Sequence, residues 1–136
     1  MSISPHTISC AIIVTYNPDI TALLELTAQL RKETDFIIVD NGSVGISSIV
    51  ESINVYEQCK EIICLDKNNG LAKALNVGIN WSLRRSYEFV FLFDQDSSLC
   101  DLFVERMIRA YIDVTEKVEA NIAAVGPRII NPQTMR

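Results

Sequence analysis

Short apolar runs rich in β-branched residues alternate along this chain with longer segments that repeat apolar residues at helical spacing. The runs predict strands at residues 8–15, 36–39, 62–65, 89–93 and 122–125. They are almost continuously apolar, which is typical of strands that are buried on both faces of a parallel sheet. Because a helix between two parallel strands must cross over the sheet, the pattern predicts an α/β fold. We expect a mainly parallel sheet with helices on both faces.

Helices are expected near residues 20–30, 47–53, 71–83 and 101–117. Asp19 suits the N-cap of the first of them. The helix after Gly70 has the clearest periodicity, because Leu71, Leu75, Ile79 and Leu83 recur every four residues. The stripe is widened by Ala74, Val77 and Trp81. This stripe is expected to face the sheet.

Composition excludes several classes of protein. The 136 residues are 49% hydrophobic and 21% charged, which is unlike a disordered tail. A net charge of −5 argues against nucleic acid as a partner. The four cysteines form no C-x-x-C pair, and the single histidine, His6, lies in an expected leader of residues 1–7, so no zinc site is indicated. Neither a signal peptide nor a membrane-spanning run is visible, and we expect a cytoplasmic protein.

Polar segments follow four of the expected strands, at residues 15–17, 40–43, 66–70 and 94–97. In parallel sheets, ligands bind outside the carboxyl ends of the strands. We therefore predict that these four segments meet at one edge of the sheet and form a binding site.

Asp94-Gln95-Asp96 ends the aromatic strand. On an extended segment the two carboxylates would point the same way, with Cα atoms about 7 Å apart. Their repulsion favours a cation, and oxygen ligands favour Mg²⁺ or Mn²⁺. The competing interpretation is an acidic turn in which Asp96 or Ser97 caps the next helix.

Asp40-Asn41-Gly42-Ser43 is typical of a tight turn, and alternatively Asp40 could accept a hydrogen bond from a nucleobase. Asn69 and Gly70 open the strongest helix, where backbone N–H groups and the helix dipole favour a phosphate. Lys73 adds a charge one turn in, although an ordinary solvated lysine is an equal interpretation. Neither the dinucleotide-binding nor the Walker pattern is present.

Taken together, four segments resemble the N-terminal, nucleotide-sugar-binding part of a family 2 glycosyltransferase of the GT-A fold, which has a Rossmann-like sheet. They are Ala-Ile-Ile-Val-Thr-Tyr-Asn-Pro at 11–18, Ile-Ile-Val-Asp-Asn-Gly-Ser at 37–43, Asn-Asn-Gly-Leu-Ala-Lys-Ala-Leu-Asn-Val-Gly at 68–78 and Phe-Leu-Phe-Asp-Gln-Asp-Ser at 91–97. Gln95 between two aspartates, and Gly-Pro-Arg at 126–128, are similar to the rhamnosyltransferase branch.

The resemblance implies a role for each candidate residue. Thr15 and Tyr16 would lie along the base and ribose, and Asp40 would hydrogen-bond the pyrimidine. The remaining residues would hold the rest of the donor: Asn69, Gly70 and Lys73 beside the nucleotide-sugar, Asp94 at the ribose or sugar, and Asp96 on a Mg²⁺ or Mn²⁺ ion bound to the diphosphate.

The resemblance further implies an inverting transfer of a sugar from deoxythymidine-diphosphate rhamnose or a uridine-diphosphate sugar. The acceptor would be a saccharide or a lipid-linked saccharide in cell-surface polysaccharide synthesis. We expect residues 1–136 to form the donor-binding domain, with the catalytic base beyond Arg136 in an acceptor-binding half. The full-length protein is expected at the inner face of the cell membrane, and an open sheet edge would favour a homo-oligomer.

Two other classes remain open. A nucleotidyltransferase that makes sugar nucleotides would carry a Gly-rich basic loop after the first strand, where this chain has Tyr16-Asn17-Pro18. A non-catalytic, receiver-like signalling domain would carry an acidic pair at that position instead.

Overall fold

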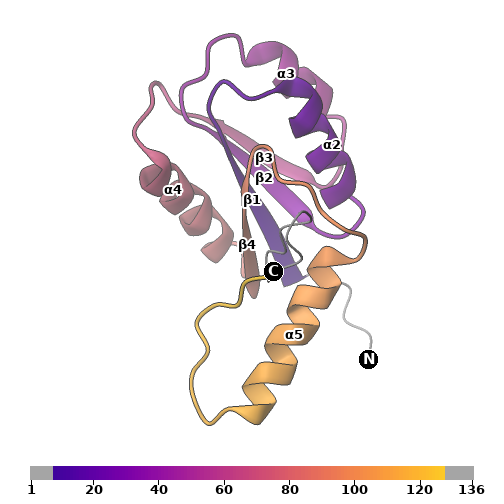
Figure 1. The fold of residues 1–136 in the computed structure, drawn as a ribbon. Helices are drawn as coiled ribbons and strands as arrows, with labels where there is room; N and C mark the ends of the chain where they lie inside the picture. The colour runs from indigo at the N-terminus through magenta and orange to yellow at the C-terminus, as the bar shows by residue number, and fades with distance from the viewer. Residues whose placement is uncertain (1–7, 128–136) are drawn as a thin grey trace, which may run out of the picture. The chain divides into compact units, whose positions relative to one another are not determined.

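The computed structural model describes residues 8–127, which form two units that divide after Asp101. The first unit alternates strands and helices (Figure 1). Its elements are β1 (Ser9–Thr15), α2 (Ile20–Leu30), β2 (Asp35–Asp40), α3 (Ser47–Ile53), β3 (Cys59–Cys64), α4 (Leu71–Leu83) and β4 (Phe89–Asp94). The second unit contains α5 (Phe103–Lys117) and the segment that follows it.

The four strands form one parallel sheet in the order β3-β2-β1-β4. Helix α4 lies on one face of the sheet, and α2 and α3 lie on the other (Figure 1). The predicted α/β class, with a parallel sheet between helices, is confirmed. The chain moves outward from β1 to β3 and then returns to place β4 on the other side of β1, so the strand order reverses between β1 and β4.

Strand β1 is the centre of the fold. Every one of its seven residues is buried, because it pairs with a strand on each side and helices cover both faces of the sheet. Asp19 caps α2 as expected, since its Oδ1 accepts a 2.9 Å hydrogen bond from the backbone N–H of Ala22. The next strand, β2, is almost as fully buried.

Helix α4 approaches the sheet most closely through small residues, and the predicted stripe is confirmed only in its middle, where Leu75 and Ile79 pack half-buried against the core. Ala74, Gly78 and Ser82 are its buried positions, whereas Leu71 and Leu83 are 54% and 64% exposed. A Cβ atom on Gly78 would lie only 2.5 Å from Cγ2 of Ile12 in β1. At Gly78 the helix backbone therefore approaches the sheet too closely for a larger side chain to fit between them.

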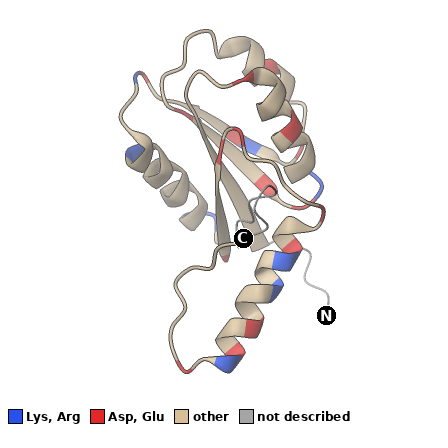
Figure 2. Cartoon of the chain, in the orientation of Figure 1, with Lys and Arg blue, Asp and Glu red and all other residues tan. Residues whose placement is uncertain are grey.

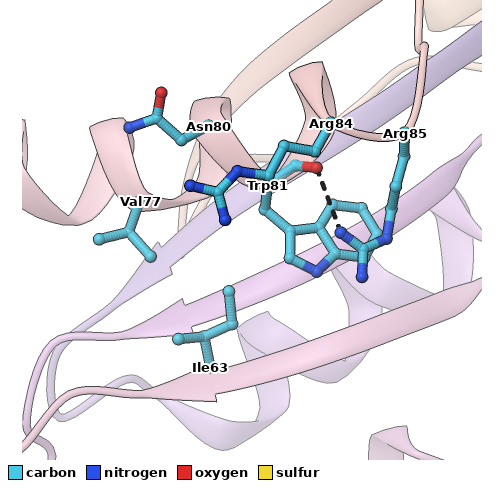
Figure 3. A pocket seen from close by; sticks show the side chains of 6 residues that line it. All are labelled: Ile63, Val77, Asn80, Trp81, Arg84 and Arg85. Atoms are coloured by element: carbon cyan, nitrogen blue, oxygen red, sulfur yellow. Dashed lines mark hydrogen bonds between the residues drawn. The ribbon is translucent and has the colours of Figure 1, made fainter.

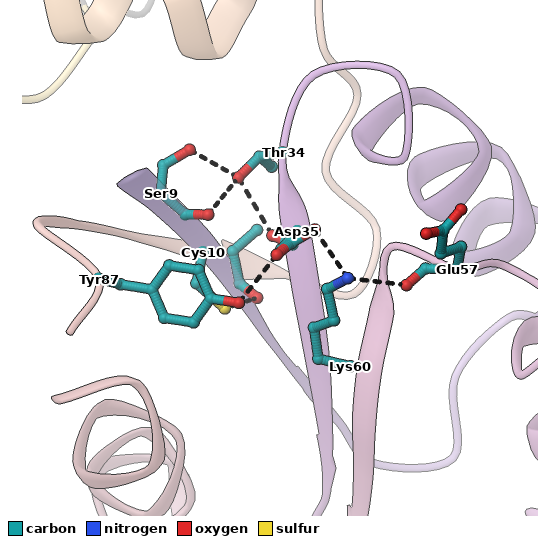
Figure 4. A network of polar contacts seen from close by, with 8 residues as sticks. Ser9, Cys10, Thr34, Asp35, Glu57, Lys60 and Tyr87 are labelled. Carbon is teal, nitrogen blue, oxygen red and sulfur yellow. Dashed lines mark hydrogen bonds and ion pairs between the residues drawn. The ribbon is translucent and has the colours of Figure 1, made fainter. Parts of the chain in front are cut away.

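A polar network joins the starts of β1 and β2 (Figure 4). The hydroxyl of Tyr87 donates a 2.8 Å hydrogen bond to the carboxylate of Asp35, which also pairs with Lys60 at 3.3 Å. Thr34 donates through its hydroxyl to the backbone oxygen of Ser9. Burial raises the pKa of the neighbouring Cys10 thiol to about 11. These residues lie at the amino ends of the strands, so we assign them a structural role.

The predicted strand at residues 122–125 is wrong, because residues 121–127 form neither helix nor strand. A strand requires a neighbour that takes up its backbone hydrogen bonds, and no described strand pairs with this segment. Instead, the hydroxyl of Tyr111 in α5 donates a 3.3 Å hydrogen bond to the backbone oxygen of Ile122. Across the described residues, no helix combines the length and hydropathy that spanning a bilayer requires.

Candidate functional site

The ends of β1 and β2 are joined through Asp40. Thr15 and Asp40 are register partners, and the Thr15 hydroxyl donates a 2.8 Å hydrogen bond to Oδ1 of Asp40. Ser43 donates to the same carboxylate twice, from its hydroxyl to Oδ1 at 2.5 Å and from its backbone N–H to Oδ2 at 2.8 Å. With 1% of its surface exposed, Asp40 is a buried acceptor that stabilises the turn after β2.

Asn17 adds a second connection between the same two loops. Its backbone N–H donates a 2.7 Å hydrogen bond to Oγ of Ser43, and its side-chain oxygen accepts one of 3.1 Å from the N–H of Val44. Asn17 has a φ of 44°, a backbone conformation that asparagine tolerates better than most residues. From the sequence, Tyr16-Asn17-Pro18 is expected to end the first strand, but the hydrogen bonds of Asn17 to Ser43 and Val44 are not expected.

Asn41 connects the turn after β2 to the loop before α4. Its Nδ2 donates a 3.0 Å hydrogen bond to Oδ1 of Asn68, and its Oδ1 accepts one of 2.9 Å from the backbone N–H of Asn69. The two loops touch at Gly42, where a Cβ atom would lie 2.6 Å from the Lys67 backbone. Asn69 is thereby held beside the turn that carries Asp40.

The segment after β4 is a turn, so the expected extended arrangement of its two aspartates is wrong. The backbone N–H of Ser97 donates a 3.1 Å hydrogen bond to the backbone oxygen of Asp94, which closes a β-turn around Gln95 and Asp96. Asp94 and Asp96 are both exposed. The helix-capping alternative is also wrong, because α5 begins at Phe103 with Leu102 at its N-cap.

Gln95 connects this acidic turn to the end of β1. Its Oε1 accepts a 2.7 Å hydrogen bond from the backbone N–H of Tyr16, and its Nε2 lies 3.4 Å from the Tyr16 backbone oxygen as a donor. The prediction that all four strand-end segments meet at one edge is thus confirmed, through Gln95, Asp40 and Asn41. The bridging role of Gln95 was missed, since nothing in its sequence pattern identifies a partner 79 residues away.

The start of α4 carries the remaining candidates. Gly70 is the N-cap residue with a φ of 88°, and its N–H donates a 2.9 Å hydrogen bond to Oδ1 of Asn68. Lys73 is exposed and is the only charged residue of α4 (Figure 2). No hydrogen bond or ion pair among the described residues brings Lys73 to the other candidates. Tyr16, whose side chain is available for stacking, is 47% exposed.

The acidic turn fits a hard divalent cation as a partial ligand set. In the described part of the chain, neither Asp94 nor Asp96 has an ion-pair partner, and no group of three or more His, Cys, Asp or Glu residues could hold an ion alone. Mg²⁺ and Mn²⁺ sites commonly use one or two carboxylates and complete their coordination with water and phosphate oxygens. The residues present therefore suit a metal that arrives with a diphosphate.

A separate groove of about 310 Å³ lies between α4 and β3 (Figure 3). Arg85 lies over the Trp81 ring at 3.8 Å, and the indole Nε1 of Trp81 donates a 2.7 Å hydrogen bond to Glu61. None of the predicted site residues lines this groove, which is completed by Ile63, Val77, Asn80 and Arg84. Trp81 and Arg85 both contact Glu61, and no strand-end segment borders the groove, so we assign the functional site to the strand ends.

Comparison with solved structures identifies the fold. The structure is similar to TarS of S. aureus, residues 1–349, with a TM-score of 0.61 and 27% identity over 80% of this chain and 33% of that one. The complex of that protein with UDP-GlcNAc matches equally well, with 26% identity over 80% of this chain and 32% of the other. A mannosyltransferase from Pyrobaculum calidifontis, in complex with GDP-Man and Mn²⁺, shares the fold at a TM-score of 0.52 and 21% identity over 70% of this chain and 30% of that one. The fold is therefore the expected GT-A fold.

Sequence comparison identifies the family. The chain is 31% identical over 121 residues to the dTDP-rhamnosyl transferase RfbF of Shigella flexneri; the match covers 89% of this chain and 38% of that protein. The chain thus spans well under half the length of this curated relative. The model of the family described as glycosyl transferase family 2 matches residues 10–125. This match selects the glycosyltransferase prediction over the nucleotidyltransferase and receiver-like alternatives, and the chain belongs to glycosyl transferase family 2.

Proposed function

We propose that this chain is the donor-binding part of an inverting rhamnosyltransferase. It would bind deoxythymidine-diphosphate rhamnose and serve transfer of the sugar to a saccharide or lipid-linked acceptor in cell-surface polysaccharide synthesis. The observation that carries the proposal is the connection of four strand ends around Asp40, Asn41 and Gln95, with an exposed acidic turn where the strand order reverses. The rhamnosyl relative favours rhamnose over other sugars.

The arrangement suits a nucleoside diphosphate that lies across the strand ends. Tyr16 offers an exposed ring and adjoins Thr15, so this loop would take the base and ribose. Asn69 and Gly70, at the start of α4, would border the diphosphate and sugar, with Lys73 adding positive charge nearby. On the opposite side, Asp94 would contact the ribose or sugar. A cytoplasmic location at the membrane is part of the same proposal.

Asp96 would hold the divalent metal, since its carboxylate is exposed in the turn after β4. A bound Mg²⁺ or Mn²⁺ ion would offset the charge that develops on the departing diphosphate. The chain's own contribution is to hold the diphosphate between this acidic turn and the positive end of the α4 helix dipole, since the N–H groups of Asn69 and Gly70 already donate to Asn41 and Asn68. We assign no catalytic base to the described residues.

The proposed contact between Asp40 and a pyrimidine requires a free acceptor position on the carboxylate and a path by which the base can reach it. Three hydrogen bonds occupy the carboxylate, and an ionised carboxylate offers about four acceptor positions. One position on Oδ2 is therefore left for a base N–H. Because Asp40 is 1% exposed, a base would reach it only after a local rearrangement of the strand-end loops.

Calorimetric titration tests the proposal. The chain is titrated with deoxythymidine, uridine and adenosine diphosphates, each with Mn²⁺ and with EDTA. We expect metal-dependent binding of the two pyrimidine diphosphates and weaker binding of the adenine one. A folded sample with no metal-dependent affinity for either pyrimidine diphosphate would overturn the proposal.

Asp40→Asn separates the structural and recognition roles of that residue. The variant keeps the size of the side chain but replaces one acceptor oxygen with a donor amide. If Asp40 reads the base, the ratio of deoxythymidine to adenosine diphosphate affinity falls in the folded variant. An unchanged ratio, with lower stability, would leave Asp40 only its observed role in joining the loops.

A further inference from the structure

Gln95 lies between two exposed carboxylates, those of Asp94 and Asp96, but its own side chain points back to Tyr16 in the loop that follows β1. Both polar atoms of its amide meet the backbone of one residue, Tyr16: Oε1 at 2.7 Å from the N–H and Nε2 at 3.4 Å from the carbonyl oxygen. An amide that matches a backbone N–H and C=O pair in this way imitates a neighbouring strand.

This contact continues the sheet beyond the point where the backbone ladder stops. The last register pair between β1 and β4 is Val14 and Asp94. Two residues further on, Tyr16 would face Asp96, but the chain has already entered its turn at Gln95, so the β4 ladder does not continue to Tyr16. The side chain of Gln95 supplies the missing pair and fixes the acidic turn against β1.

Tyr16 is also connected, through its two chain neighbours, to the turn that follows β2. Thr15 and Asn17, its chain neighbours, bond respectively to Asp40 and to Ser43. A displacement of the acidic turn therefore acts, through Gln95 and Tyr16, on the loop that would hold the base. Asp96 has no other anchor of this kind, since its side chain makes no hydrogen bond or ion pair within residues 8–127.

We propose that Gln95 is a positioning residue that couples divalent-metal binding at the acidic turn to nucleoside binding beside Tyr16. This inference rests on the proposed function and deepens it. With the amide in place, a diphosphate held by its metal presents its nucleoside to a loop already in the correct position. Without the amide, metal and nucleoside bind to parts of the site that move independently, and the affinity gained from holding both together is reduced.

Gln95→Met tests the coupling, because methionine has a similar size and shape but offers neither an amide donor nor an oxygen acceptor. Affinities are measured by calorimetry for deoxythymidine and for deoxythymidine diphosphate, the latter with Mn²⁺ and with EDTA. We expect Mn²⁺ to strengthen diphosphate binding in the unaltered chain. In Gln95→Met this enhancement should fall by roughly five- to tenfold, the lower range of measured couplings between sites. Binding of deoxythymidine alone, which involves no metal, should weaken by a smaller factor than the Mn²⁺ enhancement does. Gln29→Met, in α2, is the matched control and should retain the full enhancement.

Amide hydrogen exchange of Tyr16 gives a readout that needs no ligand. Exchange of the Tyr16 N–H should accelerate in Gln95→Met and stay slow in Gln95→Glu, because glutamate keeps an oxygen acceptor at the same position. Equal metal enhancement in Gln95→Met and the unaltered chain, or unchanged Tyr16 exchange, would overturn the inference while leaving the proposed function intact. If the unaltered chain binds no diphosphate with Mn²⁺, the proposed function and the inference both fail.

Discussion

The hydroxyl of Thr15 lies 2.8 Å from Oδ1 of Asp40, and both side chains are almost completely buried. The two residues are register partners at the ends of adjacent parallel strands. A carboxylate removed from water needs donors to replace the lost hydration, and Thr15 supplies one of three. This pair therefore joins the stability of the central sheet to the conformation of the loops around the candidate site.

Replacing Thr15 with valine should destabilise the fold by about 1–3 kcal/mol, because it removes a donor from a buried carboxylate while keeping the side-chain shape. Urea denaturation measures the change. Thr27→Val is the control: Thr27 is equally buried, but its hydroxyl bonds only to backbone oxygens of its own helix. Equal losses of stability in the two variants would show that the Thr15–Asp40 hydrogen bond contributes no more than a hydrogen bond within a helix.

The close contact at Gly42 predicts a second difference between matched variants. Gly42→Ala combines a positive φ with a Cβ atom 2.6 Å from the Lys67 backbone, whereas Gly45→Ala has a positive φ in open space. We expect Gly45→Ala to cost about 1 kcal/mol from backbone strain alone. Gly42→Ala should cost about 1–3 kcal/mol more from overpacking. Denaturation midpoints, compared between variants with equal m-values, measure the two losses of stability. A smaller loss for Gly42→Ala than for Gly45→Ala would contradict the observed loop contact.

Asp96→Asn should remove most of the Mn²⁺-dependent gain in deoxythymidine diphosphate affinity, because a neutral amide is a poor ligand for a hard cation. Affinity in EDTA should be unchanged. Asp101→Asn, an exposed carboxylate five residues later, serves as the control for the loss of one negative charge. A similar loss of the Mn²⁺ gain in both variants would indicate a general charge effect rather than a metal ligand.

Alkaline pH should destabilise the first unit through Cys10. Burial raises the pKa of this thiol from 9.0 to about 11, so between these values the unfolded chain loses a proton that the folded chain keeps. The contribution is complete below pH 9 and is lost as pH rises toward 11. Denaturation at pH 8, 9, 10 and 11 should show a flatter decline in Cys10→Ala than in Cys100→Ala. Cys59, whose pKa burial also raises to about 11, would account for part of the decline that remains.

The fold could be predicted from the sequence wherever one local pattern determines one structure. The apolar, β-branched runs identified β1 and β2, and the start of α4 follows directly from Gly70. Strand β3 begins earlier than predicted, at Cys59, because Cys59 pairs with Phe36 in β2. Such pairing depends on register, which apolar content does not specify.

The location of the candidate site could be predicted from the sequence, but the contacts between its residues could not. Strand ends meet by topology, so the polar segments that follow them were expected to gather. The choice of Gln95, Asn41 and Asn17 as the bridging residues depends on distances between loops that lie 26 to 79 residues apart in the sequence. The same limit explains why Leu71 and Leu83, at the ends of the α4 stripe, were expected to be buried but are exposed, since only the structure shows that α4 meets the sheet at Gly78 and Ile12.

The central position of β1 has a consequence for how the protein is made. Its pairing with β2 uses residues 35–40, but its other edge must wait for residues 89–94. During synthesis on the ribosome, a largely apolar strand therefore keeps one edge unpaired while about 50 further residues are added after β2. An open edge of this kind favours association with other chains. The nascent chain is thus most vulnerable to aggregation between the emergence of β2 and that of β4.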